Sequence, residues 1–194
     1  MSEFGLYFQL GKEHILDYAN GYDHILFVLA LCAVYLLRDW KKIIILVTAF
    51  TLGHSLTLAL SVFDVIKVNA ELIEFLIPIT IFITAFSNII KRGPTYSDKL
   101  IQLNYAYALF FGLIHGMGFS GYLKALLGKD RIVSQLFAFN LGLELGQIIV
   151  VAIFLVISFI LVDIFGVNRR DWKLVLSAGI AGISLILIKE AIFW

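Results

Sequence analysis

Residues 14–27 read H-I-L-D-Y-A-N-G-Y-D-H-I-L-F, and the apolar run that follows continues to Leu37. This stretch places two histidines and two aspartates, at positions 14, 17, 23 and 24, beside a segment of membrane-spanning length. Imidazoles and carboxylates bind metal ions and carry protons, and they are costly to bury in hydrocarbon. The stretch therefore predicts a membrane helix with a chemical task at its edge.

The composition is that of an integral membrane protein. Of the 194 residues, 61% are hydrophobic and 15% are charged, against about 25% charged in an ordinary soluble domain, and the mean hydropathy is +0.96. The net charge of +1 gives no indication of nucleic-acid binding. The single cysteine, Cys32, excludes an internal disulfide and a cysteine metal motif. The N-terminus has no pattern of a cleavable signal peptide, so the first span is expected to direct insertion.

Six apolar runs are long enough to cross a bilayer, which takes roughly 17–25 helical residues. They lie at 21–37, 42–63, 70–90, 102–124, 136–165 and 173–193, and charged residues fill the connectors. Because lipid cannot satisfy backbone polar groups and no strand-like alternation is present, these runs are expected to be helices. The prediction is an all-α fold: a single integral membrane domain over residues 1–194, with about six transmembrane helices and a short interfacial helix at 4–18.

The distribution of lysine and arginine gives the expected orientation. Nine of these residues lie on the side of the first, third and fifth connectors, and six lie on the side of both termini. The positive-inside rule therefore predicts extracytoplasmic termini.

Three ionisable residues within the spans are expected to lie at one depth. A charged side chain at mid-bilayer costs about 2.5–3.5 kcal/mol, so such residues are functional candidates. At about 1.5 Å per residue, His54, His115 and Glu144 each lie about 12–14 Å below the face that carries the termini. Asp23, His24 and Glu74 are expected nearer that face, and His14 just outside it. These groups predict a column from the surface to mid-membrane.

Imidazole and carboxylate donors without thiolate favour Ni, Co or Zn over Cu(I). The same groups could carry protons, and a lone membrane histidine can also be a helix-bridging residue. Asp17 is as well explained by a solvated interfacial position. Gly112 and Gly116 form a small-xxx-small pattern that allows close helix contact. The side chains expected to line the path or to support ligands are Glu74, Thr51, Ser55, Asn140 and Gln147.

Several sequence blocks together resemble the HupE/UreJ family of bacterial membrane proteins, in its shorter branch. The blocks are HILDYANGYDHILFVLAL (14–31), VTAFTLGHSLTLAL (47–60), ELIEFLIPITIFITAFSNI (71–89), FGLIHGMGF (111–119) and FNLGLELGQ (139–147), and the resemblance covers about residues 11–150. One departure is Thr80, where a serine is expected.

The resemblance implies a nickel, or nickel and cobalt, permease in the bacterial inner membrane. It makes these residues the candidate metal ligands: His14, Asp23, His24, His54, His115 and Glu144. The expected partners are the lipid bilayer and a divalent metal ion, with no nucleic acid.

Two further functions remain open at this point. The inner halves of the spans hold only neutral polar groups, which favours a blind cavity and hence an intramembrane zinc-dependent hydrolase using the same residues. A metal-sensing or structural role is the third interpretation. A permease whose site opens to the extracytoplasmic side is the leading one. The neutral groups of the inner halves are Thr48, Thr84, Asn88, Asn104 and Tyr107.

Overall fold

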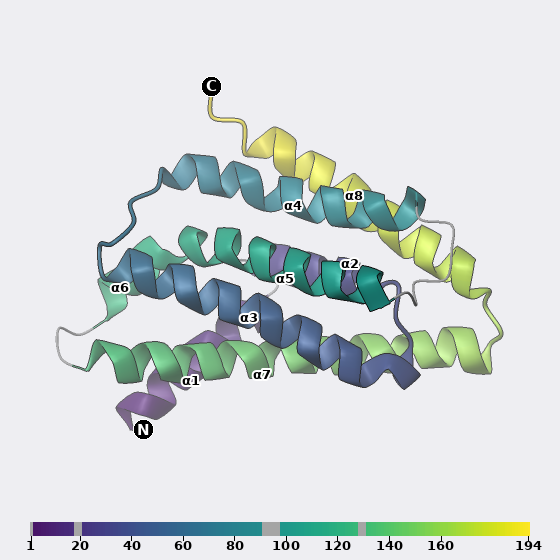
Figure 1. Ribbon diagram of the computed structural model, residues 1–194, viewed down its shortest axis with the longest axis horizontal. Helices are drawn as coiled ribbons and strands as arrows, with labels where there is room; N and C mark the ends of the chain where they lie inside the picture. The colour runs from purple at the N-terminus through teal and green to yellow at the C-terminus, as the bar shows by residue number, and fades with distance from the viewer. Residues whose placement is uncertain (1, 18–20, 91–97, 128–130) are drawn as a thin grey trace.

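The computed structural model describes residues 2–17, 21–90, 98–127 and 131–194, and these are helical, with no strand among them (Figure 1). The predicted all-α class is confirmed. The segments 18–20, 91–97 and 128–130, which include part of the opening stretch and of two charged connectors, lie outside the described residues. The helices are α1 (Glu3–Leu16), α2 (Tyr22–Cys32), α3 (Trp40–Val62), α4 (Ala70–Ile90), α5 (Asp98–Gly118), α6 (Ser120–Leu126), α7 (Ile132–Phe159) and α8 (Arg169–Glu190), with short helices η1 (Leu37–Asp39) and η2 (Ile160–Ile164).

Four helices within the described residues are long and apolar enough to cross a membrane, at Leu37–Val62, Ala70–Ile90, Ile132–Ile164 and Arg169–Glu190. A fifth candidate span is the bent pair of Asn104–Gly118, within α5, and α6, whose axes meet at 52°. The chain is therefore a multi-pass membrane protein. The helix at Ile132–Ile164 has 33 residues, about 50 Å at 1.5 Å per residue, which agrees with the over-long run predicted at 136–165.

The predicted first span at 21–37 is wrong in its extent. Helix α2 has 11 residues, about 16 Å, which is roughly half of the hydrocarbon thickness. The helix expected at 4–18 is present as α1. Helix α1 packs along the first half of α7. Glu3 contacts Arg131 and Gln135 near the start of both helices, and Gly146 lies against Ile15 further along.

Helix α2 continues from α1 toward the opposite end of the bundle. Near its end, the Nδ2 of Asn88 donates to the Ala30 carbonyl at 2.7 Å, and Arg169 donates to the Val34 carbonyl at 2.8 Å. Asn88 is close to the end of α4, and Arg169 begins α8. Helix α1 ends at Leu16 and α2 begins at Tyr22, and the two together reach from one end of the bundle to the other. Neither is long and apolar enough to be a candidate span, so the described residues hold four or five such spans and the predicted count of about six is slightly high. Discontinuous helices of this kind build binding sites near the middle of a membrane.

Glycines set the closest helix contacts. A Cβ built at Gly11 would lie 1.9 Å from the Phe139 carbonyl oxygen, so α1 and α7 touch backbone to backbone. Helices α3 and α5 meet in the same way, because a Cβ at Gly112 or Gly116 would lie 2.2 Å from a carbonyl oxygen of α3. The predicted small-xxx-small contact is confirmed, and Gly53 is its counterpart on α3.

We call the end of the bundle where α1 begins and α3 ends the terminal face, and the end where α3 begins and α4 ends the opposite face. In Figure 1 the terminal face is at the left and the opposite face at the right. Helix α4 continues through Pro78 without interruption, so Thr80 causes no break there.

Candidate metal centre

All four histidines of the chain meet at one place, each from a different helix. The ring centroid of His24 lies 4.7 Å from that of His14, 5.1 Å from that of His115 and 5.7 Å from that of His54. The centroids of His14 and His54 are 6.3 Å apart. Two imidazoles on one tetrahedral ion, with metal–nitrogen distances near 2.0–2.1 Å, have centroids about 5 Å apart. In this histidine cluster, the distances from His24 to His14 and to His115 are close to this value, and the two distances to His54 are longer.

The cluster corrects the expected column. His14 and His24 lie beside His54 and His115, not nearer the terminal face, because the break between α1 and α2 carries both of them into the bundle. Gly21 permits this turn: a Cβ there would lie 2.2 Å from the His14 carbonyl oxygen.

Several ring nitrogens of the cluster have no hydrogen-bond partner in the protein. The Nε2 atoms of all four histidines, and also the Nδ1 of His54, are buried without a hydrogen bond. A buried polar atom left unpaired costs about 1–3 kcal/mol, so each one calls for an explanation such as an unseen ion or water. The cluster therefore carries an unusual concentration of unsatisfied acceptors or donors.

In His115 and His24, a contact made by the Nδ1 atom orients the imidazole ring. The Nδ1 of His115 donates to the Phe111 carbonyl at 2.9 Å, and the Nδ1 of His24 contacts the Asp23 carboxylate at 2.9 Å. A carbonyl can only accept, so neutral His115 carries its proton on Nδ1 and leaves the Nε2 lone pair free. A carboxylate beside Nδ1 favours the same tautomer of His24. Both Nε2 atoms are thus available as ligands.

The cluster is compact but not fully assembled. Across the described ranges, no three histidine, cysteine, aspartate or glutamate side chains are arranged as a group that could hold a metal ion. The ring spacing is suitable, whereas the nitrogen atoms do not converge. In this arrangement, three imidazoles of the cluster do not form a metal site.

The carboxylates predicted as ligands lie around the cluster. Asp23 contacts His24 and lines a cavity of about 300 Å³ with Glu74 and Glu190. The carboxylate of Glu144 accepts a hydrogen bond from the Thr48 hydroxyl at 2.7 Å. Thr48 is six residues from His54 along α3, about 9 Å, so Glu144 is set apart from the histidines.

Among the other polar residues near the cluster, one pair connects two helices. The Thr51 hydroxyl donates to Gln147 Oε1 at 2.8 Å and so links α3 to α7. Ser55 donates to the Thr51 carbonyl, and Asn140 to the Leu136 carbonyl, each within its own helix. Thr51 and Ser55 therefore do not orient the ring of His54, contrary to expectation.

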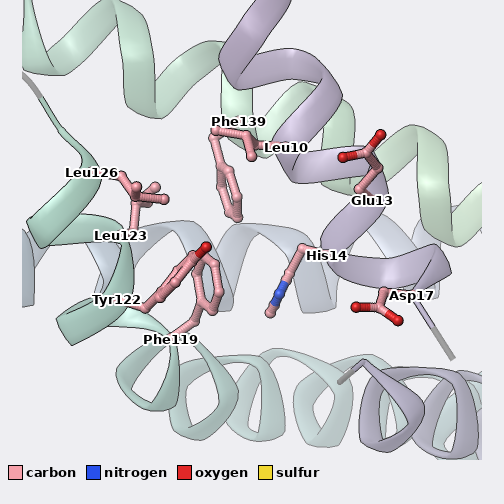
Figure 2. A pocket seen from close by; sticks show the side chains of 9 residues that line it. All are labelled: Leu10, Glu13, His14, Asp17, Phe119, Tyr122, Leu123, Leu126 and Phe139. Atoms are coloured by element: carbon pink, nitrogen blue, oxygen red, sulfur yellow. The ribbon is translucent and has the colours of Figure 1, made fainter. Parts of the chain in front are cut away.

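A cavity of about 520 Å³ leads to His14. Helix α1, α6 and α7 surround it, and Figure 2 shows the imidazole of His14 projecting between the carboxylate of Asp17 and the ring of Phe119. The carboxylate of Glu13 lies on the same wall. This outer cavity is lined by residues of α1, α6 and α7 and reaches one member of the cluster, His14.

Three phenylalanines cover the other side of the cluster. Phe27, Phe50 and Phe111 are buried, and their rings contact each other with centroids 5.0 Å apart for Phe27 and Phe50, and 5.6 Å for Phe27 and Phe111. Each lies one helical turn from a histidine, toward the opposite face. We call these three residues the phenylalanine layer.

The phenylalanine layer was not predicted from the sequence. The signal was present in the spacing F-x-x-x-H at 50–54 and 111–115, and H-x-x-F at 24–27. Residues three or four positions apart share a helix face. A phenylalanine therefore shares a helix face with each of these three histidines, His24, His54 and His115.

The comparison with protein families identifies the chain. The family model described as HupE / UreJ protein matches residues 1–193, and the chain therefore belongs to this family. No curated protein and no solved structure matches it.

Proposed function

We propose that this chain is a divalent transition-metal permease of the nickel and cobalt type, and that the histidine cluster is the site through which the ion passes. The observation that carries the proposal is the meeting of four histidines with unpaired, buried Nε2 atoms. Neutral imidazoles suit Ni, Co and Zn. The family to which the chain belongs is associated with the same cargo.

The outer cavity supports capture of the ion. Two carboxylates, of Glu13 and Asp17, lie on its wall, and His14 lies at its inner end. Negative charge in a low-dielectric cleft concentrates cations and raises the rate of their association. A hydrated ion would exchange water first for His14 and then for His24, whose ring centroid is 4.7 Å away.

The incomplete assembly of the cluster supports transport over permanent retention. An ion held by a rigid set of four imidazoles would be released slowly. Conduction requires a site that binds the ion weakly enough for it to leave. In this proposal Asp23 orients His24 and is not itself a ligand. Glu144 is bonded to Thr48 and has a supporting place between α3 and α7.

The phenylalanine layer supports a dry barrier below the cluster. Hydrophobic constrictions close a path by excluding water, so an ion leaving the cluster must pass without most of its hydration shell. We further propose that the terminal face is extracytoplasmic in a bacterial inner membrane. The excess of lysine and arginine on the opposite side supports this orientation.

Uptake of Ni²⁺ into proteoliposomes and equilibrium dialysis in detergent together test the proposal. His54→Ala and His115→Ala are each expected to lose binding and uptake, while Ser184→Ala, a buried hydroxyl on α8 bonded within its own helix, keeps both. Unchanged binding in both histidine variants would refute the site. Zinc that stays bound through dialysis, with no uptake by the wild type, would favour the intramembrane hydrolase.

A further inference from the structure

A third cavity lies beyond the phenylalanine layer, toward the opposite face. Its volume is about 220 Å³. Phe111 borders it, and the same residue accepts the hydrogen bond from His115, so one residue separates the cavity from the cluster. The lining is mixed. Its polar residues are Thr84, Ser87, Asn88, Asn104 and Tyr107, and the rest of its wall is apolar, from Ala30, Leu31, Val34, Leu46, Ile83 and Phe111. We call this space the inner cavity.

The lining offers neutral oxygen atoms. Asn88 donates through Nδ2 to the Ala30 carbonyl, which can only accept, so its amide orientation is fixed and its Oδ1 is left for another partner. The Nδ2 of Asn104 contacts the Tyr35 hydroxyl at 3.3 Å. Thr84 and Ser87 donate to carbonyls of α4, at 2.8 and 3.0 Å, which leaves their oxygen lone pairs as acceptors.

The volume suits an ion with its water shell. Six water molecules at about 30 Å³ each occupy about 180 Å³, and the inner cavity offers about 220 Å³. Oxygen acceptors without charge bind the hydrogens of coordinated water and hold the ion weakly. The outer cavity differs, because carboxylates and an imidazole line it.

We propose that the inner cavity is the release site for a hydrated divalent cation, where the ion regains water after it passes the phenylalanine layer. This inference rests on the proposed function, because it names the step that follows the histidine cluster. It also supplies the continuation that a permease needs and a hydrolase does not.

The test compares two residues on α4. Thr84 lines the inner cavity and Thr80 does not, and both are buried threonines that donate to carbonyls of their own helix. Asn88→Leu and Thr84→Val are expected to lower Ni²⁺ uptake, the former about tenfold, the size of a lost supporting contact at a metal site. Thr80→Val is expected to keep wild-type uptake. Equilibrium Ni²⁺ binding should stay within about twofold in all three, because separated sites act nearly independently.

The outcomes separate the two proposals. If Asn88→Leu and Thr84→Val elute as the wild type in detergent and keep full uptake while His54→Ala loses it, the release site is wrong and the permease stands. If the wild type takes up no Ni²⁺, both fail. Thr84→Cys in a Cys32→Ser background adds a second readout: a small thiol reagent should label it from the opposite face only, and a cavity filled by lipid would give no labelling.

Discussion

Gly142→Ala would force α1 away from α7 and so displace His14. The added Cβ would lie 1.9 Å from the Phe8 carbonyl oxygen, whereas ordinary contact begins at 3.4 Å, so the helices must separate by the difference, 1.5 Å. A backbone carbonyl cannot turn aside as a side chain can. Metal–nitrogen distances tolerate only about 0.2 Å, and we therefore expect the Ni²⁺ affinity to fall by about 10–100-fold. Overpacking should also cost about 1–3 kcal/mol, or roughly 2–12 °C in melting temperature.

Isothermal titration with Ni²⁺ and thermal unfolding in detergent measure the two effects. Gly182→Ala on α8 is the matched control, because nothing lies within 4 Å of the added Cβ. Alanine is the better helix former by up to about 1 kcal/mol, so the control should be neutral or slightly stabilising. Wild-type affinity and melting temperature in Gly142→Ala would refute the backbone contact between α1 and α7.

Three further predictions concern single contacts. Asp23→Asn removes the carboxylate that orients His24 and should weaken Ni²⁺ binding about 10–100-fold by titration; unchanged affinity would contradict that role. Phe111→Ala opens the barrier, so Ni²⁺ flux into proteoliposomes should become non-saturable, at a cost near 3–5 kcal/mol in stability; saturable flux would argue against a barrier. The hydrogen bond from Lys124 lowers the pKa of Asp64, so this ion pair persists in mild acid and is lost as the pH falls through that lowered pKa; Lys124→Met should return the pKa of Asp64 toward its ordinary value in an NMR titration.

Hydropathy predicted most of the helices because lipid imposes the pattern directly. The run at 70–90 matches α4 at both ends, and the run at 42–63 differs from α3 by two residues or fewer. The helix contact at Gly112 and Gly116 could also be predicted from the sequence, since close approach of two backbones requires small residues at that spacing. The end of α2 could not be predicted from the sequence. The apolar residues continue past Cys32 without a proline or glycine, yet the helix ends there, and beyond it the Val34 carbonyl accepts a hydrogen bond from Arg169.

The depth rule succeeded for half of the histidine cluster. His54 and His115 lie on continuous helices, so counting residues at a fixed rise gave their common level. The same rule misplaced His14 and His24 because it assumed that α1 lies at the surface. Glu144 shows a second limit of the rule: a common depth does not fix the direction in which a side chain projects, and its carboxylate meets Thr48.

The break between α1 and α2 is what makes the cluster possible. In one continuous helix, residues ten positions apart are separated by about 15 Å along the axis, too far for His14 and His24 to reach one ion. The break brings their ring centroids to 4.7 Å. It also ends α1 and begins α2 inside the bundle, the arrangement by which discontinuous helices build binding sites in membranes. In the proposed permease, this is the place where imidazoles from two successive helices would reach one ion.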